Sequence, residues 1–489
     1  MADVEPFGVV VLIVSLAALA AVFSNRISAW LRIPAPVIFL VCAAAASDLV
    51  PSLGGLSTTS VQRIVTVALA VVLFDGGMHI GWKRFRSAAG SVVWTGVAGT
   101  FVTAAAIAVA AHVVCGFDWQ IALVIGTALS PTDPAVVFSV LGRREITGRT
   151  GVILEGESGA NDPVGIALMV SLLAAGSGGG IDFGGVAVDF LLQMVIGGAV
   201  GFFGGKLLVI VMRHVQLPNE GLYALRTLAM ALALYGIATV AHGSGFLAVF
   251  VAGILVGDER APYKAEIKRF HASLASIAEI VAFVVLGLTV NLGSLADGGA
   301  WLIGLVLAVL LAFVIRPLFV GLVLWPVRLR FGERVFVLFS GLKGAVPILL
   351  GTFVLGAGLG DTTLIYDVIF VVVAFSVLVQ GSLVPTVARW CGVPMREVEL
   401  TPWGLGVRFR ERPEGLRRLR VASGAAADGR AIEDLDIGET VWISMVIRDA
   451  QPLHVRPSTV IQAGDEVLVL VDPEQSRDPG PVFTVPLNG

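Results

Sequence analysis

The sequence predicts an all-α polytopic membrane protein that continues into a small cytosolic α/β domain. Of its 489 residues, 56% are hydrophobic and 14% are charged, and the mean hydropathy is +0.90. Soluble globular chains carry about 25% charged residues, so most of this chain is expected to lie in lipid. The three cysteines, Cys42, Cys115 and Cys391, form no metal or disulfide pattern.

About thirteen apolar segments meet the requirement of about 20 residues for a spanning helix. Two of them, the fifth and the twelfth, contain S-P-T-D-P (130–134) and G-L-K-G-A-V-P (341–347), and proline breaks a helix. The two breaks are an odd number of crossings apart, so the first six and last six crossings are predicted to be inverted repeats with broken, crossed helices. The segments lie near 7–24, 34–50, 61–80, 88–114, 119–141, 149–175, 184–212, 222–241, 243–258, 272–291, 300–326, 334–358 and 363–388.

Basic residues occur in every second loop between these segments, whereas the alternate loops at 115–118 and 291–299 hold none. The positive-inside rule places basic loops in the cytoplasm. We therefore expect the N-terminus outside and the C-terminus in the cytoplasm. The basic residues are Arg26 and Arg32; Lys83, Arg84 and Arg86; Arg143, Arg144 and Arg149; Arg213; Arg260, Lys264, Lys268 and Arg269; Arg328, Arg330 and Arg334; and Arg389 and Arg396.

Charged residues return after the last crossing, and the apolar runs shorten to strand length. The runs at 440–447 and 466–471 are rich in β-branched residues and predict strands, while 431–438 predicts a short helix that ends at glycine. The predicted organisation is a transmembrane domain over 1–390, a linker over 391–404, a small domain over 405–473 and a flexible tail over 474–489.

Several ionisable residues fall inside the predicted crossings, where each costs about 2.5–3.5 kcal/mol or more and usually faces a polar cavity or a partner. Asp162 is about 20 Å into its crossing, and Asp133 and Lys343 are near the middle of theirs. We therefore expect acids and a base at one level. The others are Asp75, Glu157 and Arg316, together with Glu155 and Glu279, which are near enough to their crossing ends to reach the cytoplasmic interface.

Asp162 is the strongest candidate for an ion site. Ser158 and Asp162 are four residues apart, so one helix face offers a hydroxyl and a carboxylate. Glu157 and Asn161 have the same spacing on a face turned towards a neighbouring helix.

Simpler roles remain open for four other residues. Asp133 can merely cap a broken helix end, and Lys343 can merely neutralise half-helix carbonyls. Arg316 can extend towards the inner interface, and Asp75 can bond to its neighbours in F-D-G-G.

The motifs G-E-S-G-A-N-D-P (156–163), S-P-T-D-P and G-L-K-G-A-V-P resemble those of NhaP-type monovalent cation:proton antiporters. The later region resembles the TrkA-C, or RCK C-terminal, regulatory domain, and the combination is similar to the potassium/proton antiporter subgroup. The resemblance implies an NhaA-like fold in the cell (inner) membrane, a homodimer surrounded by lipid, and a regulatory C-terminal domain that could bind a nucleotide or an ion, sense pH, or only dimerise.

The resemblance also implies roles for individual residues. Asp162 would be the shared site of cation and proton, and Asp133 would neutralise the crossed half-helix dipoles. An alkali cation would be held by Asp162, Ser158, Thr132 through its backbone carbonyl, and Asp75. Glu157 and Asn161 would tie to the base on the twelfth crossing, which is Lys343 where the family usually has arginine; lysine lacks the planar fork of arginine.

Competition at one carboxylate predicts exchange. A desolvated carboxylate resists ionisation, so Asp162 is neutralised by a proton or by partly dehydrated K+ or Na+, but hardly by both. Because its neighbour is Asn161 rather than a second acid, we expect one proton per cation and no net charge movement. Alternating access would rock one bundle against the other around this site. We expect no enzyme activity, resident cofactor or nucleic-acid partner.

Two other classes compete with this interpretation. A ligand-gated monovalent cation channel could carry the same C-terminal domain, although an obligate titrating carboxylate does not suit an open pore. An intramembrane hydrolase is suggested by G-E-S-G-A, but Ala160 stands where a G-x-S-x-G elbow needs glycine, and the predicted context is a membrane crossing.

Overall fold

The chain divides into two compact units, Met1–Glu399 and Leu400–Gly489, and each has a hydrophobic core of its own. The predicted first crossing (7–24) and the bases Arg26, Arg32, Arg143 and Arg260 lie outside the described residues. The computed structural model describes residues 35–49, 55–141, 144–146, 148–175, 182–259, 261–297, 299–357, 361–397, 416–438, 441–448, 451–453, 455–471 and 479–484.

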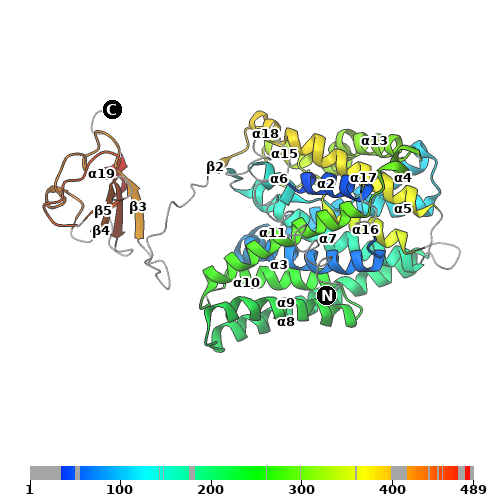
Figure 1. The fold of residues 1–489 in the computed structure, drawn as a ribbon, viewed down its shortest axis with the longest axis horizontal. Helices are drawn as coiled ribbons and strands as arrows, with labels where there is room; N and C mark the ends of the chain where they lie inside the picture. The colour runs from blue at the N-terminus through cyan, green and yellow to red at the C-terminus, as the bar shows by residue number, and fades with distance from the viewer. Residues whose placement is uncertain are drawn as a thin grey trace, which may run out of the picture. The chain divides into compact units, whose positions relative to one another are not determined.

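The first unit is a helical bundle (Figure 1). Within the described residues, seven helices are long and apolar enough to cross a membrane, and four shorter apolar helices accompany them. A polytopic all-α membrane fold is therefore confirmed. Its helices are α2 (Ala35–Leu49), α3 (Thr58–Val93), α4 (Gly99–Cys115), α5 (Trp119–Ala128), α6 (Pro134–Leu141), α7 (Arg149–Ala175), α8 (Phe183–His214), α9 (Glu220–Val240), α10 (Gly245–Gly257), α11 (Lys264–Leu288), α12 (Leu292–Asp297), α13 (Ala300–Leu310), α14 (Gly321–Val323), α15 (Phe331–Phe339), α16 (Ala345–Leu355), α17 (Thr362–Phe375) and α18 (Gly381–Trp390).

The two predicted helix breaks are present, and they meet. The first separates α5 from α6, and the second separates α15 from α16. The backbone N–H of Asp133, in the first break, donates a hydrogen bond of 2.8 Å to the carbonyl of Leu342 in the second. Non-helical backbone at membrane depth is tolerated only where it is packed on protein or lines a cavity, and here the two breaks supply that packing for each other.

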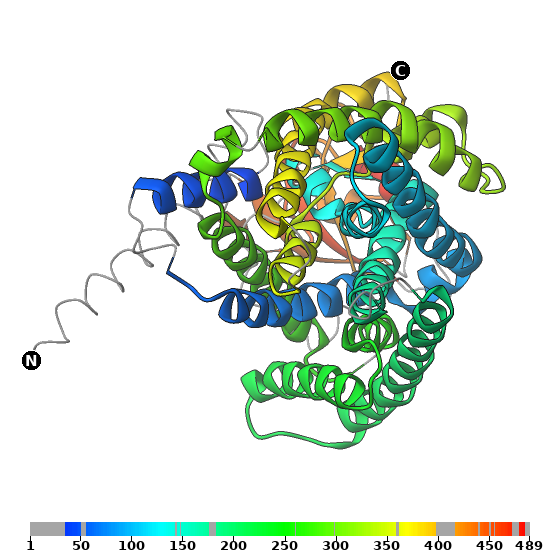
Figure 2. The same cartoon turned by 90° about the vertical axis from the view of Figure 1, so that its right-hand side faces the viewer.

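Helix α7 is the most enclosed of the candidate spans in the described part of the chain. The buried share of the apolar stretch is 72% in α7 and 22% in α8. In Figure 2, α8 and α9 (teal to green) form the lower rim of the first unit, and the remaining helices gather above them. Residues carried by α7 are thus shielded by protein, whereas much of α8 is available to lipid.

One helix boundary agrees with the predictions, and another differs because charged residues were taken to end a crossing. The crossing predicted to end near residue 80 is followed by a kink at Gly81, whose backbone is not helical (φ 69°, ψ 161°), and a second helical segment follows within α3. Helix α11 begins at Lys264 rather than near residue 272, so Glu279 lies deeper along its helix than expected. A helix continues into the interface when its backbone hydrogen bonds are satisfied, whatever the polarity of its side chains.

Helices α3 and α10 pack with their backbones in close approach. A Cβ added at Gly77 would lie 2.5 Å from the carbonyl oxygen of Phe250, and one at Gly257 would lie 2.6 Å from the Cα of Gly81. At Gly253 it would collide with the carbonyl of Phe74. Small residues four apart on both helices are typical of tight packing in membranes, and this seam fixes the helix that carries Asp75.

The C-terminal unit is an antiparallel sheet in the order β3-β6-β4-β5. The predicted strands at 440–447 and 466–471 are confirmed as β4 and β6. The predicted helix at 431–438 is a single turn, Ile432–Asp434, and the chain then bends at Gly438 (φ 80°). The bounds are β3 (Leu416–Arg420), β4 (Val441–Arg448), β5 (Gln451–Leu453), β6 (Glu466–Val471) and α19 (Gly480–Thr484).

Two segments predicted to be irregular are ordered where the structure describes them. Residues 479–484, in the predicted flexible tail, include α19, whose Phe483 is fully buried in the core of the sheet domain. In the predicted linker, β2 (Met395–Glu397) pairs antiparallel with β1 (Arg144–Ile146). Both segments are too short for a periodic signal, so the sequence pattern did not reveal them.

A buried ion pair ties β4 to the turn before β6. Asp465 accepts hydrogen bonds of 2.8 Å from Nε and Nη2 of Arg448 and from the N–H of Gln462. Burial alone would raise the pKa of Asp465, but these hydrogen bonds outweigh it, and the pKa lies below its usual value. The carboxylate therefore contributes stability at neutral pH that is lost as the pH falls through this lowered pKa.

We predict that Gly253→Val disrupts the contact between α3 and α10. Overpacking costs about 1–3 kcal/mol, so the purified variant should melt at lower temperature and yield less folded protein. The matched control is Gly236→Val on α9, where an added Cβ meets nothing within 4 Å. Equal melting temperatures for the two variants would contradict the packing described here.

Candidate functional site

Asp133 lies where the N-terminal ends of two half-helices converge. Its Oδ1 accepts a hydrogen bond of 2.8 Å from the N–H of Ala135, and the N–H of Ala345, at the start of α16, also donates to its carboxylate. A Cβ added at Gly344 would collide with the same carboxylate. Negative charge is stabilised at helix N-termini, so the charge of Asp133 is balanced by the ends of α6 and α16.

Lys343 neutralises the opposite kind of helix end. Its Nζ donates to the carbonyls of Ser130 (3.1 Å) and Pro131 (3.0 Å), just beyond the C-terminal end of α5. Its own backbone N–H donates to Oγ of Ser376. The side chain is 1% exposed. Of the two roles considered for Lys343, these contacts correspond to the neutralisation of half-helix carbonyls.

Glu157 is paired with Arg316, whereas the family resemblance implied a tie to Lys343, whose ammonium interacts with Glu157 electrostatically. Nη2 of Arg316 lies 3.3 Å from Oε1 of Glu157, and its Nε donates to the carbonyl of Leu338 at 2.9 Å. The guanidinium fills the space beside Gly341 that a Cβ would need. Arg316 is 2% exposed, so it does not extend to the interface. It reaches Glu157 because the glycine leaves room for it, while the ammonium of Lys343 is held by the α5 carbonyls.

Asn161 links α7 to the first helix break rather than to Lys343. Its Nδ2 donates to Oγ1 of Thr132 at 2.7 Å, and its Oδ1 accepts from the N–H of Thr132 at 3.3 Å. This two-point contact satisfies backbone that the break leaves unpaired. It also fixes the position of Thr132 relative to the helix that carries Asp162.

Asp162 is the buried acid of this cluster whose charge is least compensated. It is 8% exposed, and among the described residues no hydrogen bond reaches its buried Oδ1. Asp133 and Lys343 both interact with it electrostatically, but each already serves a helix end. Ser158 is also buried and lies four residues earlier on the continuous helix α7, so its hydroxyl shares the face of Asp162.

Asp75 is less directly connected to this cluster. Its Oδ2 lies 3.2 Å from Nδ1 of His79, one helical turn later on α3, and its Oδ1 is buried without a hydrogen bond in the described part of the structure. Among the described residues its contacts therefore lead to His79 and not to Asp162.

Two ionisable residues that the sequence places inside crossings received no predicted partner. Arg316 was predicted to be able to extend towards the interface, although a buried acid such as Glu157 needs a base. The other is Glu279, whose Oε1 is buried without a hydrogen bond in the described residues. Its depth depended on where α11 begins, and charged residues hid that boundary.

A buried charge is costly unless a partner balances it. Here the N-terminal ends of α6 and α16 balance the charge of Asp133, and the carbonyls that follow α5 balance the charge of Lys343. Arg316 balances the charge of Glu157. Asp162 forms no such pair among the described residues, so a proton or a coordinated cation from solution can balance its charge. The arrangement can bind either one at a single carboxylate.

Comparison with known proteins agrees with this chemistry. Residues 12–390 match the family described as "Sodium/hydrogen exchanger, transmembrane". This chain belongs to that family. Residues 416–478 match the TrkA-C domain, which spans the sheet of the C-terminal unit. This exchanger-family membrane protein therefore carries the transporter and C-terminal domains that the motifs indicated.

Similar proteins extend over nearly the whole chain. The K(+)/H(+) antiporter NhaP of Alkalimonas amylolytica is 33% identical over 474 residues, which cover 95% of this chain and 82% of the relative. The K(+)/H(+) antiporter NhaP2 of Shewanella oneidensis is 32% identical, with coverages of 96% and 82%. The sodium proton antiporter MjNhaP1 from Methanocaldococcus jannaschii shares the fold, with a TM-score of 0.65 at 22% identity over 78% of this chain and 100% of that chain.

We predict strong coupling between Glu157 and Arg316. Arg316→Met leaves a buried carboxylate unpaired, and the loss of one member of a buried pair costs about 3–5 kcal/mol. Adding Glu157→Gln to this variant should recover part of the loss. Thermal unfolding of the purified single and double variants measures the coupling, with the exposed Arg389→Met as control. A double variant no more stable than Arg316→Met would contradict the pairing.

Proposed function

We propose that this protein is a secondary antiporter that exchanges K+ for H+ across the membrane, with Asp162 as the shared binding site. The observation that carries the proposal is the compensation of charge. Asp133 and Lys343 contact helix ends and Glu157 pairs with Arg316, while among the described residues Asp162 forms no ion pair and its buried Oδ1 accepts no hydrogen bond. A proton and a cation then compete for one carboxylate, which couples their movements.

The choice of K+ rests on the similar proteins named as K(+)/H(+) antiporters, which are matched over almost the full chain. A relative named Na(+)/H(+) antiporter NhaH, from Halobacillus dabanensis, is 28% identical and covers 67% of this chain. Na+ is therefore the alternative cation. Thr132, held by Asn161, and Ser158, which shares the face of Asp162, are the oxygen donors that we assign to the cation shell beside Asp162. Asp75 would join them only in a state in which α3 brings it closer.

We infer that exchange is electroneutral. The neighbour of Asp162 is the neutral Asn161, which already bonds to Thr132, so one carboxylate carries either one proton or one monovalent cation. An empty, charged site crosses the membrane poorly because desolvation is costly. Each passage then needs an occupant, and alternating access turns that requirement into exchange.

The proposed setting is the cell (inner) membrane, with the N-terminus outside, the C-terminus in the cytoplasm, and the protein as a homodimer. Basic loops support the orientation, and apolar side chains exposed on α8, such as Val195, Phe203 and Leu207, suit contact with lipid.

A ligand-gated cation channel is the second candidate, because a regulatory domain follows the last crossing. The buried carboxylate favours exchange, since an open pore gains nothing from an obligate titrating group in its path. A hydrolase is disfavoured by the position of Ser158 in the interior of the continuous helix α7 rather than at a strand-to-helix turn.

We predict that Asp162→Asn abolishes exchange, because an amide neither ionises nor releases a proton. In proteoliposomes with a trapped pH dye, K+, Na+ or Rb+ is added outside, and cation-driven proton movement is followed. The wild type should respond and saturate, and Asp162→Asn should give less than about 1% of its rate, a loss of two decades or more in keeping with the removal of the coupling group. Normal exchange by Asp162→Asn would refute the assignment, and cation current without a counter-gradient would favour the channel.

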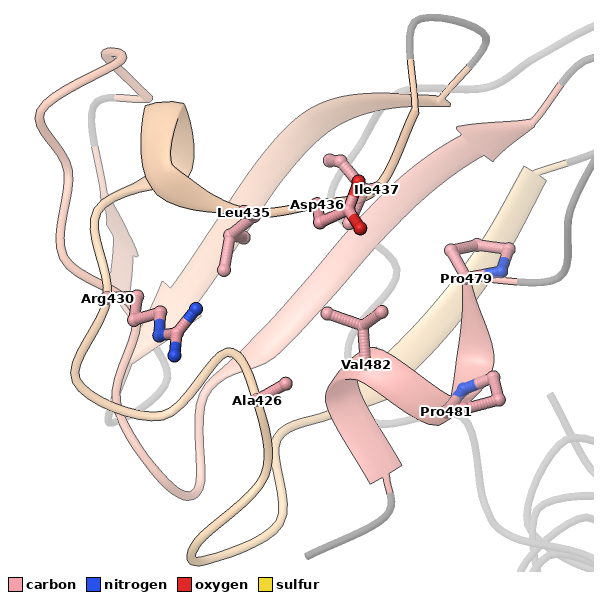
Figure 3. Close-up of a pocket in the computed structure, with 8 residues that line it drawn as sticks. All are labelled: Ala426, Arg430, Leu435, Asp436, Ile437, Pro479, Pro481 and Val482. Atoms are coloured by element: carbon pink, nitrogen blue, oxygen red, sulfur yellow. The ribbon is translucent and has the colours of Figure 1, made fainter. Parts of the chain in front are cut away.

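We propose that the C-terminal unit regulates transport by binding a small ligand, either a nucleotide or an ion. A cavity of about 330 Å³ opens between α19 with the preceding Pro479 and the loop residues Ala426, Arg430 and Leu435 to Ile437. Figure 3 shows that Arg430 and Asp436 bring opposite charges to the cavity, with Leu435 between them; the other lining side chains are apolar. A few polar groups in an apolar cavity are typical of small-molecule sites.

We predict that deletion of residues 405–489 changes the dependence of exchange on pH or on ligand while the membrane unit remains competent. The same dye assay, repeated across a range of internal pH, measures the profile. Arg430→Ala should reproduce the change if the cavity holds the regulator, and Arg420→Ala on the exposed side of β3 is the control. An identical profile after deletion would remove the regulatory role.

A further inference from the structure

Glu279 is near the two helix breaks, because Asp133 interacts with it electrostatically. It is about 22 Å along α11 from Lys264, at 1.5 Å per residue. The helix starts from basic residues, and hence from the predicted cytoplasmic side. Glu279 therefore lies between that side and the cluster that contains Asp162.

Among the described residues, an acidic side chain interacts with Glu279 and no basic side chain does. Its Oε1 is buried without a hydrogen bond in the described residues, and Asp133 interacts with it electrostatically. Helix α11 packs on α16, α3, α2 and α9. Helix α16 has no ionisable side chain, and Asp75 of α3 interacts with His271 of α11. Arg226 of α9 donates to the carbonyls of Val211 and Val215, and Asp48 is exposed at the end of α2. The other ionisable residues of α3 and α9 are Arg63, His79, Lys83, Arg84, Arg86, Glu220, Tyr223 and Tyr235. Among the described residues, Asp133 is the charged group found to act on Glu279.

A structural role does not account for this carboxyl group. A buried acid that stabilises a fold does so through a base or through several N–H donors. The described surroundings of Glu279 instead add the negative charge of Asp133. The group must be neutralised from solution, by a proton or by a cation, which is the condition already found for Asp162.

We propose that Glu279 is a second ion-exchanging carboxylate, a relay that binds the monovalent cation in transit between the cytoplasmic side and Asp162. This inference rests on the proposed function. Glu279 releases its proton to the cytoplasmic side when a cation arrives, and it takes up the proton that Asp162 releases when the cation moves on to that residue. The charge at Glu279 is the same before and after, so the relay leaves the overall exchange of one proton for one cation unchanged.

Glu279→Gln keeps the size of the side chain and removes its ionisation. The half-saturating K+ concentration for exchange should rise about tenfold, a change that corresponds to about 1.4 kcal/mol, while the maximal rate stays within about threefold of wild type. Glu279→Asp should restore most of the affinity. The matched control is Glu266→Gln in the first turn of the same helix, which should leave both parameters unchanged.

Binding without transport provides a second measurement that separates this inference from the proposed function. Purified wild-type protein should gain thermal stability as KCl replaces a bulky organic chloride at constant ionic strength, and Asp162→Asn should lose this gain. Glu279→Gln should need about tenfold more K+ for the same gain.

If Glu279→Gln binds K+ like wild type, the relay is wrong, even when exchange itself is intact. If wild type binds K+ but does not exchange it, the proposed function fails and the binding comparison still decides on Glu279. If Glu279→Gln misfolds, Glu279→Ala is measured in its place, with the same expected shift of about tenfold; a wild-type response of Glu279→Ala would equally overturn the relay.

Discussion

The structure depends on local compensation of charge where two interrupted helices meet inside the membrane unit. The contact between Asp133 and Leu342 brings N-terminal and C-terminal half-helix ends together. Asp133 then faces the positive ends, and Lys343 faces the carbonyl ends. Because both side chains are engaged by the backbone, neither forms an ion pair with Asp162 among the described residues, and a proton or a cation from solution can balance its charge.

In the network around this crossing, the side chains that hold helices together are different from the side chain that is proposed to bind the ion. Arg316 holds Glu157, and Asn161 holds Thr132, so two side chains next to Asp162 on α7 fasten that helix to its neighbours. Asp162 itself makes few such contacts, which keeps it available to an ion. A site of this kind keeps its geometry while its occupant changes, as alternating access around a fixed site requires.

Much of this could be predicted from sequence because the membrane imposes simple rules. Hydropathy located the spans, prolines located both breaks, and the spacing from Ser158 to Asp162 placed a hydroxyl and a carboxylate on one face. Pairing between distant helices could not be predicted in the same way. Arg316 and Lys343 are both buried bases, and only the space left by Gly341 decides which of them reaches Glu157. The depth of Glu279 was missed because it depends on a helix end hidden by charged residues.

The small sheet formed by β1 and β2 has a mechanical consequence. Strand β2 is the last described part of the first unit before the chain leaves for the C-terminal unit, and β1 lies between α6 and α7. Tension applied to the chain beyond residue 397 is therefore borne by the backbone hydrogen bonds of this two-stranded clip. This tension acts on the connection between α6, which follows Asp133, and α7, which carries Asp162.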